Sequence, residues 1–271
     1  MADTPQTAVG NTPEKKSLYF DLQAYWGITK HIGGLRATDD LAQRCHMNPE
    51  SYVLVIGCGT GKTSSYLARK HGCHIAGIDI STKMVNLAKK QADKDGMADR
   101  TEFQVADAQN LPFSDNEFDA VIAESVSVFI PDKHQAMTEY VRVIKPGKYV
   151  GMNEVTWLQP PTPRVAEYFQ ITMDARPLDA EGWQSLMADA GLQEISAQVH
   201  QPKILNMWLD EMRQMGFREA VTAWGKFFYL LLKGSPEIRD FIKRTWPPPW
   251  NILKYMGCGI YAGRKQDKTA K

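Results

Sequence analysis

The sequence predicts an α/β protein with a doubly wound, mostly parallel sheet of seven strands and a helical insertion before the last strand. Three observations support this prediction. Short β-branched runs alternate with helix-like segments between residues 52 and 200. A glycine-dense loop follows the first run, as in folds that bind ligands at the carboxyl ends of their strands. A helical stretch then precedes a final strand-like run.

The expected strands are seven short runs rich in apolar residues. They cover residues 52–57, 74–79, 101–107, 118–125, 148–157, 192–200 and 252–265. Helix-like segments cover residues 63–70, 133–143 and 179–190. A further helix opens at Ser81, with Ser81 or Thr82 as its N-cap. Because crossovers are right-handed, the loops after the first four strands should share one edge of the sheet, where ligands bind.

Three segments lie outside this alternation. Residues 1–16 are polar and rich in Thr and Pro, and we expect a disordered tail. Residues 17–47 should form an N-terminal lid, helical in pieces, over the ligand site. Residues 201–250 should form a helical cap, which "WPPPW" ends because prolines break a helix. The domain would then run from residue 17 to residue 271.

The composition is that of a globular protein with one substantial core. Of 271 residues, 43% are hydrophobic and 23% are charged. The 32 basic residues nearly balance the 31 acidic ones, which argues against a nucleic-acid partner but leaves a local basic patch open. Scattered cysteines and histidines predict no metal site. The sequence shows no signal-peptide pattern and no membrane-length apolar run, so we expect a soluble, cytoplasmic protein.

The loop "GCGTGKTSS", residues 57–65, narrows the ligand class. A triphosphate loop requires a glycine where the chain has Ile56. A dinucleotide loop requires glycine or alanine where the chain has Lys62. What remains is G-x-G-x-G, formed by Gly57, Gly59 and Gly61. This pattern lets the backbone pass close beneath a flat or zwitterionic ligand, with a helix N-terminus near its carboxylate.

The loop and the acidic residues that follow strands two and three resemble the motifs of class I S-adenosylmethionine-dependent methyltransferases. The resemblance runs from about residue 17 to 200 and includes the last strand. It implies a Rossmann-like methyltransferase fold and S-adenosyl-L-methionine as the cofactor, bound above Gly57, Cys58, Gly59 and Gly61.

Two motifs extend the resemblance along the cofactor. In "GIDIS", it implies that Asp79 accepts both ribose hydroxyls through charge-assisted hydrogen bonds, while Ile80 and Met84 flank the adenine. In "VADAQNLPF", it implies that Asp107 receives the adenine amino group and that the backbone of Ala108 reaches a ring nitrogen.

The "LPF" ending of that motif and the opening "FD" of the fourth strand resemble the branch near the ubiquinone and menaquinone biosynthesis methyltransferases. Glu124 and Ser125, at the end of strand four, should line the methionine side of the donor. One position departs from the family, which usually has Asp or Glu where this chain has Val55. The departure predicts weaker donor binding or a substitute such as Glu124 or a backbone carbonyl.

The segment before the core, "GGLRAT", resembles phosphoethanolamine methyltransferases, in which a Gly-Gly turn meets the cofactor; here that turn contains Gly33. Tyr19 and Tyr25 are the expected lid tyrosines, and packing against the sheet edge is their alternative role. Those enzymes place a histidine after strand four, whereas this chain has "ESVSVFI". Phosphoethanolamine is therefore not the expected acceptor.

The predicted function is methyl transfer, by direct in-line attack, to a small-molecule acceptor. The aromatic residues of the cap favour an apolar or aromatic, lipid-like or amine acceptor. Tyr25 and Glu154 are the candidate catalytic bases where the acceptor must lose a proton. "WGKFFYLLLKG" leaves peripheral membrane contact open, and a monomer or homodimer is expected. The alternatives are a regulatory protein that binds the donor with little turnover, and methylation of RNA or protein.

Overall fold

The computed structural model describes residues 32–201, 221–222, 225–226 and 228–267. Its centre is one sheet with the order β3-β2-β1-β4-β5-β8-β7, and a short β6 pairs with β5 beside this path. The strands are β1 (Tyr52–Ile56), β2 (His74–Asp79), β3 (Thr101–Val105), β4 (Phe118–Glu124), β5 (Ile144–Trp157), β6 (Leu178–Asp179), β7 (Leu192–His200) and β8 (Met256–Lys265). The first six strands pair in parallel, and β8 pairs antiparallel with β5 and β7. The predicted doubly wound, mostly parallel sheet is confirmed.

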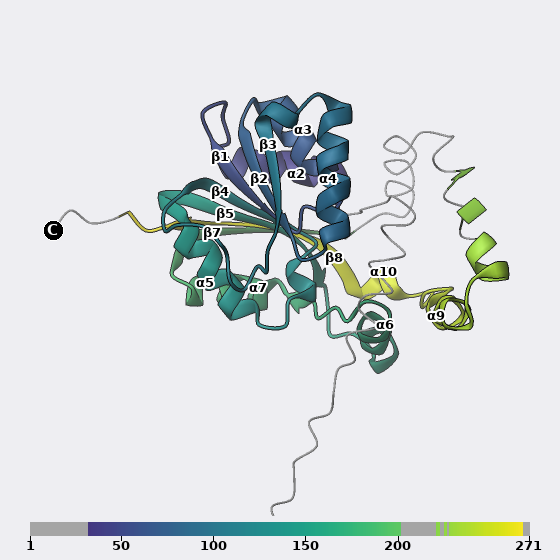
Figure 1. Cartoon of the computed structure of the whole chain (residues 1–271). Coiled ribbons are helices and arrows are strands. Elements are labelled where there is room, and N and C mark those ends of the chain that lie inside the picture. The colour runs from purple at the N-terminus through teal and green to yellow at the C-terminus, as the bar shows by residue number, and fades with distance from the viewer. Residues whose placement is uncertain (1–31, 202–220, 223–224, 227, 268–271) are drawn as a thin grey trace, which may run out of the picture.

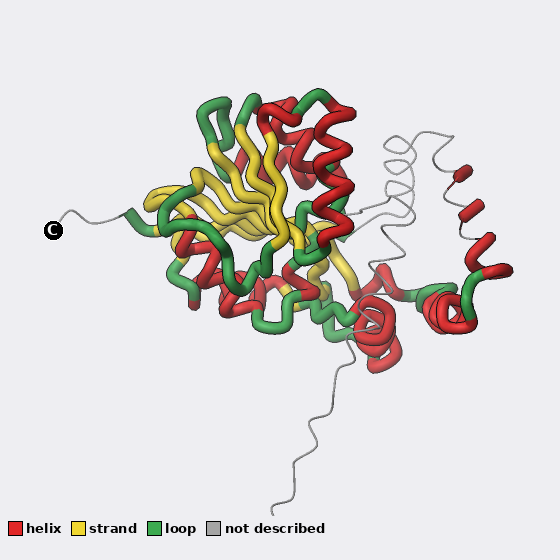
Figure 2. Tube along the Cα trace, in the orientation of Figure 1, coloured by secondary structure: helices red, strands yellow, loops and turns green. Residues whose placement is uncertain are grey.

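Helices cover both faces of the sheet (Figure 1). On one face, α2 (Gly34–Arg44), α3 (Lys62–His71) and α4 (Thr82–Asp95) share a buried cluster with β1 and β2. On the other face, α5 (Lys133–Val143), α6 (Pro163–Met173) and α7 (Ala180–Asp189) share a second cluster with β4 and β5. Figure 2 shows the sheet between these two helical layers. Each strand of the centre is therefore buried on both sides, which explains the continuous apolar runs in the sequence.

Most element boundaries follow the local signals in the sequence. Ser81 caps α4 by accepting the Met84 N–H at 3.4 Å, as predicted. The predicted fifth strand begins earlier, at Ile144, and passes through Pro146 with a register shift. The first four residues of the predicted last strand instead form α10 (Ile252–Tyr255). Helix α6 was not predicted, although a proline at its first turn is a helix-start signal.

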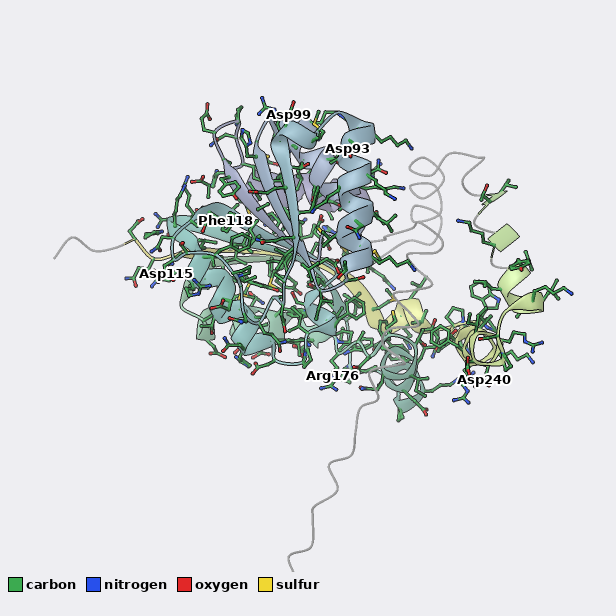
Figure 3. All side chains as sticks on the ribbon, viewed as in Figure 1. Asp93, Asp99, Asp115, Phe118, Arg176 and Asp240 are labelled. Carbon is green, nitrogen blue, oxygen red and sulfur yellow. The ribbon has the colours of Figure 1, made fainter. Side chains whose placement is uncertain are left out.

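The expected tail, residues 1–16, lies outside the described residues, as do residues 17–31 of the lid. Of the lid, α2 is described. Of the cap, residues 228–233 are helical and α9 (Pro236–Thr245) follows them. In Figure 3, Asp240 on α9 lies well outside the sheet, on the other side of the molecule from Asp99 and Asp115. Among the described residues, no helix has the length and apolar character needed to cross a membrane.

Candidate functional site

The loops that follow β1, β2 and β4 meet at one edge of the sheet. Ile56, the last residue of β1, pairs with Ile78 of β2 on one side and with Ala123 of β4 on the other. Because all three strands are parallel, Asp79, Ser125 and the glycine loop lie beside one another just past these partners. The two short 3-10 helices, η1 (Ala98–Arg100) and η2 (Ser127–Phe129), lie at opposite edges: η1 precedes β3, whereas η2 follows β4.

The three glycines of the loop all adopt left-handed backbone conformations. Their φ values are 63° at Gly57, 53° at Gly59 and 79° at Gly61. A Cβ atom on Gly57 would lie 2.5 Å from Cγ2 of Val126, in the turn after β4. A Cβ atom on Gly61 would lie 2.8 Å from Cα of Ala88 on α4. At Gly57 and Gly61, glycine is therefore required both by the backbone angle and by the close approach of a neighbouring segment.

Asp79 is held in a fixed orientation by the loop itself. The Gly59 N–H donates to Oδ2 at 3.0 Å, and the Ser81 N–H donates to Oδ1 at 2.9 Å. Burial raises the pKa of this carboxyl, and the two N–H donors partly offset that rise. Each carboxylate oxygen can accept a further hydrogen bond, so two oxygens remain able to accept a pair of neighbouring hydroxyls.

The residues expected around the adenine form an open rim. Ile80 is 72% exposed, which is unusual for a large apolar side chain. Met84, on α4, is buried instead. Asp107 is exposed, and its Oδ1 accepts the Gln109 N–H at 2.9 Å. Ala108 is half-buried. An exposed apolar residue beside an exposed carboxylate fits a flat ligand that carries an amino group.

At the other end of the loop, Glu124 is fixed by two neighbours. The Thr38 hydroxyl on α2 donates to both carboxylate oxygens, at 3.0 and 3.2 Å. The side-chain amide of Asn153 donates to Oε1 at 3.4 Å and also to the backbone carbonyl of Ile32. In return, the Ile32 N–H donates to the Ser125 hydroxyl at 3.0 Å. This network joins the start of α2 to the carboxyl end of β4 and to Asn153, its partner on β5.

Glu124 also lies on the same side of the sheet as Val55. The register pairs Val55 with Ile122, and Glu124 is two residues further along the same strand. Side chains two residues apart on a strand point to the same face. Glu124 therefore places a carboxylate on the same face as Val55, one strand over and closer to the loop edge. The sequence did not identify Thr38 and Asn153, because only long-range packing brings them to Glu124.

The remaining predicted residues are placed as follows. Gly33, with φ 85°, has no room for a Cβ atom, which would lie 2.7 Å from Sγ of Cys258. Cys58 is buried, and burial raises the pKa of its thiol. Tyr19 and Tyr25 lie outside the described residues. Within the part of the chain that the structure describes, no group of His, Cys, Asp and Glu is arranged to hold a metal ion.

Glu154, predicted as a candidate base, is completely buried behind the site. Its Oε1 accepts the N–H groups of Val126 at 3.2 Å and Ser127 at 2.7 Å. Burial raises the pKa of this carboxyl to about 7, against the lowering effect of those donors. Proton removal from an acceptor by Glu154 stays an untested prediction, and its position favours support of the turn after β4.

Comparison with known proteins agrees with this geometry. Residues 54–152 match the model of a methyltransferase domain. The methyltransferase GfsG of Streptomyces halstedii is 30% identical over 225 residues, which cover 76% of this chain and 81% of GfsG. The chain belongs to the class I S-adenosylmethionine-dependent methyltransferases. The methyltransferase therefore uses S-adenosylmethionine, and the site residues described above fit that donor: a glycine loop, an anchored acidic residue and an apolar rim.

Other relatives are similar over shorter stretches. Phosphoethanolamine N-methyltransferase 1 of Arabidopsis thaliana is 31% identical over 169 residues, 61% of this methyltransferase and 33% of that protein. Among solved structures, the [4+2]-cyclase SpnF has a TM-score of 0.75 at 22% identity and covers 94% of this chain and 96% of its own. Phosphoethanolamine N-methyltransferase 2 of Haemonchus contortus, solved with S-adenosylhomocysteine, has a TM-score of 0.71 at 19% identity and covers 92% of this chain and 57% of its own. These structures support the fold.

Proposed function

We propose that this methyltransferase transfers a methyl group to a small-molecule acceptor that is apolar or aromatic, lipid-like or an amine. The observation that supports this acceptor class is the position of the aromatic segment. Met256, the first residue of β8, pairs with Trp157, the last residue of β5. Residues 228–255 therefore enter the sheet at the carboxyl edge, the edge of the glycine loop. Several large apolar side chains of this segment are exposed, namely Phe228, Tyr229, Leu232, Trp246 and Trp250.

The chemistry requires alignment more than acid–base catalysis. Bound S-adenosylmethionine supplies the methyl group from a positively charged sulfonium centre. In this proposal Asp79 holds the ribose, the rim at Ile80 and Asp107 holds the adenine, and Glu124 holds the ammonium group of the methionine end. The backbone of the glycine loop excludes water beneath the donor, and the apolar cap side chains exclude it above.

A turnover assay tests the acceptor class directly. The full chain is incubated with S-adenosylmethionine and separate acceptors: an aromatic hydroxyl compound, a prenyl-type lipid, a tertiary amine and phosphoethanolamine. The proposal expects S-adenosylhomocysteine to accumulate with at least one of the first three and not with phosphoethanolamine. Product with phosphoethanolamine alone would contradict it.

Two alternatives are outcomes of the same experiment. Tight donor binding without product for any acceptor favours a donor-binding protein with little turnover. The similar fold of SpnF, a [4+2]-cyclase, supports keeping this alternative, because that protein is named for a reaction other than methyl transfer. Product with RNA or protein as acceptor, with binding that weakens in salt, favours the third class.

Peripheral membrane contact is part of the proposal for the cap. Residues 221–254 hold six basic residues and two acidic ones, beside the exposed aromatic side chains of the same segment. Trp and Tyr at an interface and basic residues toward anionic headgroups are the features of surface-bound segments. Sedimentation with anionic vesicles but not with neutral phosphatidylcholine vesicles is expected, and equal recovery in both supernatants would contradict it. A cytoplasmic location and a monomer or homodimer complete the proposal, and fractionation and light scattering test them.

A further inference from the structure

The turn after β4 is supported by a buried carboxyl group on the side away from the glycine loop. Ser125 has a φ of 53°, and the next residue, Val126, packs against the Cα of Gly57. Behind the turn, Oε1 of Glu154 accepts the N–H groups of both Val126 and Ser127. Glu154 thus fixes the segment that closes against the loop.

The second oxygen of Glu154 is in an unusual position. Oε2 is buried and makes no hydrogen bond among the described residues, and the same is true of the Ser127 and Tyr140 hydroxyls. The Ser127 hydroxyl nevertheless lies close enough to lower the pKa of both Glu154 and Tyr140. A buried oxygen without a partner is costly when charged, but a proton on Oε2 turns it into a donor toward these hydroxyls. The free protein therefore keeps the proton on this carboxyl up to a higher pH than an exposed glutamate would.

Glu154 titrates near neutral pH, whereas the titratable residues packed around it do so only at much higher pH. When Glu154 is ionised, its charge raises the pKa of three residues packed around it: Tyr140 on α5, and Cys258 and Tyr261 on β8. Burial is the main cause of each rise, and the pKa values of Cys258 and Tyr261 reach about 12. Three further carboxylates raise the pKa of these neighbours. Asp107 acts on Tyr140, Glu124 on Cys258 and Asp179 on Tyr261. Burial and hydrogen bonds from Val126, Ser127 and Val128 shift the pKa of Glu154, and no cation of the described residues is among these causes.

We propose that Glu154 is a buried counter-charge for the sulfonium of the donor. Glu154 releases a proton to solvent when the donor binds and takes one up from solvent again once the sulfonium has become an uncharged thioether. The inference rests on the proposed placement of the methionine end of the donor over Ser125 and Gly57. A positive charge in front of the turn stabilises a carboxylate behind it, since charges in a protein interior are weakly screened. Proton release from Oε2 then accompanies binding of S-adenosylmethionine but not of S-adenosylhomocysteine. Glu154 acts through the turn, so it is a positioning residue.

The ratio of the affinities for S-adenosylmethionine and S-adenosylhomocysteine tests this inference. Both ligands carry the same amino and carboxyl groups, so their own titrations cancel in the ratio. In the wild type, calorimetry should show the ratio rising about three- to tenfold between pH 6 and pH 8.5, as expected for one weakly screened charge pair. In Glu154→Gln, which keeps an acceptor for the two N–H groups, the ratio should be flat. Glu50→Gln, an exposed residue before β1, should behave as the wild type.

A second measurement uses the wild type alone and covers the case in which Glu154→Gln fails to fold. Binding near pH 7, measured in two buffers of different ionisation enthalpy, should release more protons with S-adenosylmethionine than with S-adenosylhomocysteine. Equal proton release, or a ratio that does not change with pH, overturns the role of Glu154 while leaving the donor site intact. If neither ligand binds at any pH, the donor site itself is refuted, and the inference with it.

Discussion

Thr38 on α2 donates its hydroxyl to both carboxylate oxygens of Glu124 at the end of β4, at 3.0 and 3.2 Å. The two residues are 86 positions apart in the sequence. The contact fixes a carboxylate at the carboxyl end of β4. The neighbouring strand β1 has the apolar Val55 at the position where related methyltransferases usually have an acidic residue. It also ties α2 to the carboxyl end of β4, next to the glycine loop.

The first prediction concerns this pair. Glu124→Gln should weaken S-adenosylmethionine binding about tenfold or more, because a charge-assisted hydrogen bond typically contributes about 1.5–3 kcal/mol to binding. Thr38→Val should weaken binding by a smaller factor, since it removes only the group that orients the carboxylate. Calorimetric titration of both variants provides the measurement. Asp93→Asn, an exposed residue of α4 labelled in Figure 3, is the control. Unchanged affinity in Glu124→Gln would assign the ammonium group to another residue.

The second prediction concerns Asp79, which the loop holds through the N–H groups of Gly59 and Ser81. Asp79→Ala should remove most of the donor affinity, roughly 100-fold or more, because two charge-assisted hydrogen bonds to the ribose are lost. Asp79→Asn keeps the size of the side chain and should lose less. Asp99→Asn, at the opposite edge of the sheet, should bind like the wild type. Full affinity in Asp79→Ala would show that the site is assigned wrongly.

The third prediction separates backbone strain from steric conflict in the glycine loop. Gly57 and Gly96 have similar φ values, 63° and 65°, but a Cβ atom would meet Val126 at Gly57 and nothing within 4 Å at Gly96. Both alanine variants should lose about 1 kcal/mol of stability from the left-handed backbone. Only Gly57→Ala should lose more than that, together with donor affinity.

Thermal unfolding and donor titration of both variants decide this point. Adding Val126→Ala to Gly57→Ala should restore part of the loss, because it removes the Cγ atoms that a Cβ would meet. Equal losses in Gly57→Ala and Gly96→Ala would mean that the contact with Val126 is not what requires a glycine at residue 57.

The fourth prediction is a pH dependence of stability without any ligand. Burial raises the pKa of Glu154 from 4.5 to about 7, so the folded state binds a proton that the unfolded state has already released between these values. Stability from this group is fully present below pH 4.5 and is lost as the pH rises through about 7. Relative to Glu154→Gln, the wild type should therefore lose on the order of 2–3 kcal/mol between pH 4.5 and pH 8.

Unfolding midpoints of the two proteins across this pH range provide the measurement. Their difference isolates Glu154, because every other titrating group is common to both. A constant difference from pH 4.5 to pH 8 would show that Glu154 is already ionised in the folded protein.

The sequence predicted the sheet well because each strand is a short apolar run ended by a turn signal. The loop class also followed from residue types alone: Ile56 and Lys62 exclude two ligand classes, and three glycines satisfy the third. The start of the last strand was harder, because residues 252–255 carry apolar residues compatible with a strand or a buried helix end.

By itself, the sequence determined the strand order along the chain, the glycine loop and the acidic residue Asp79 at the end of β2. Only the tertiary structure decided which side chains join that edge from a distance. Asn153 and Glu154 are neighbours on β5, yet one bonds Glu124 and Ile32 on the α2 face while the other supports the β4 turn on the α5 face. Strand alternation predicts that two neighbours point to opposite faces. It does not say what packs there, because those partners come from long-range pairing and helix placement.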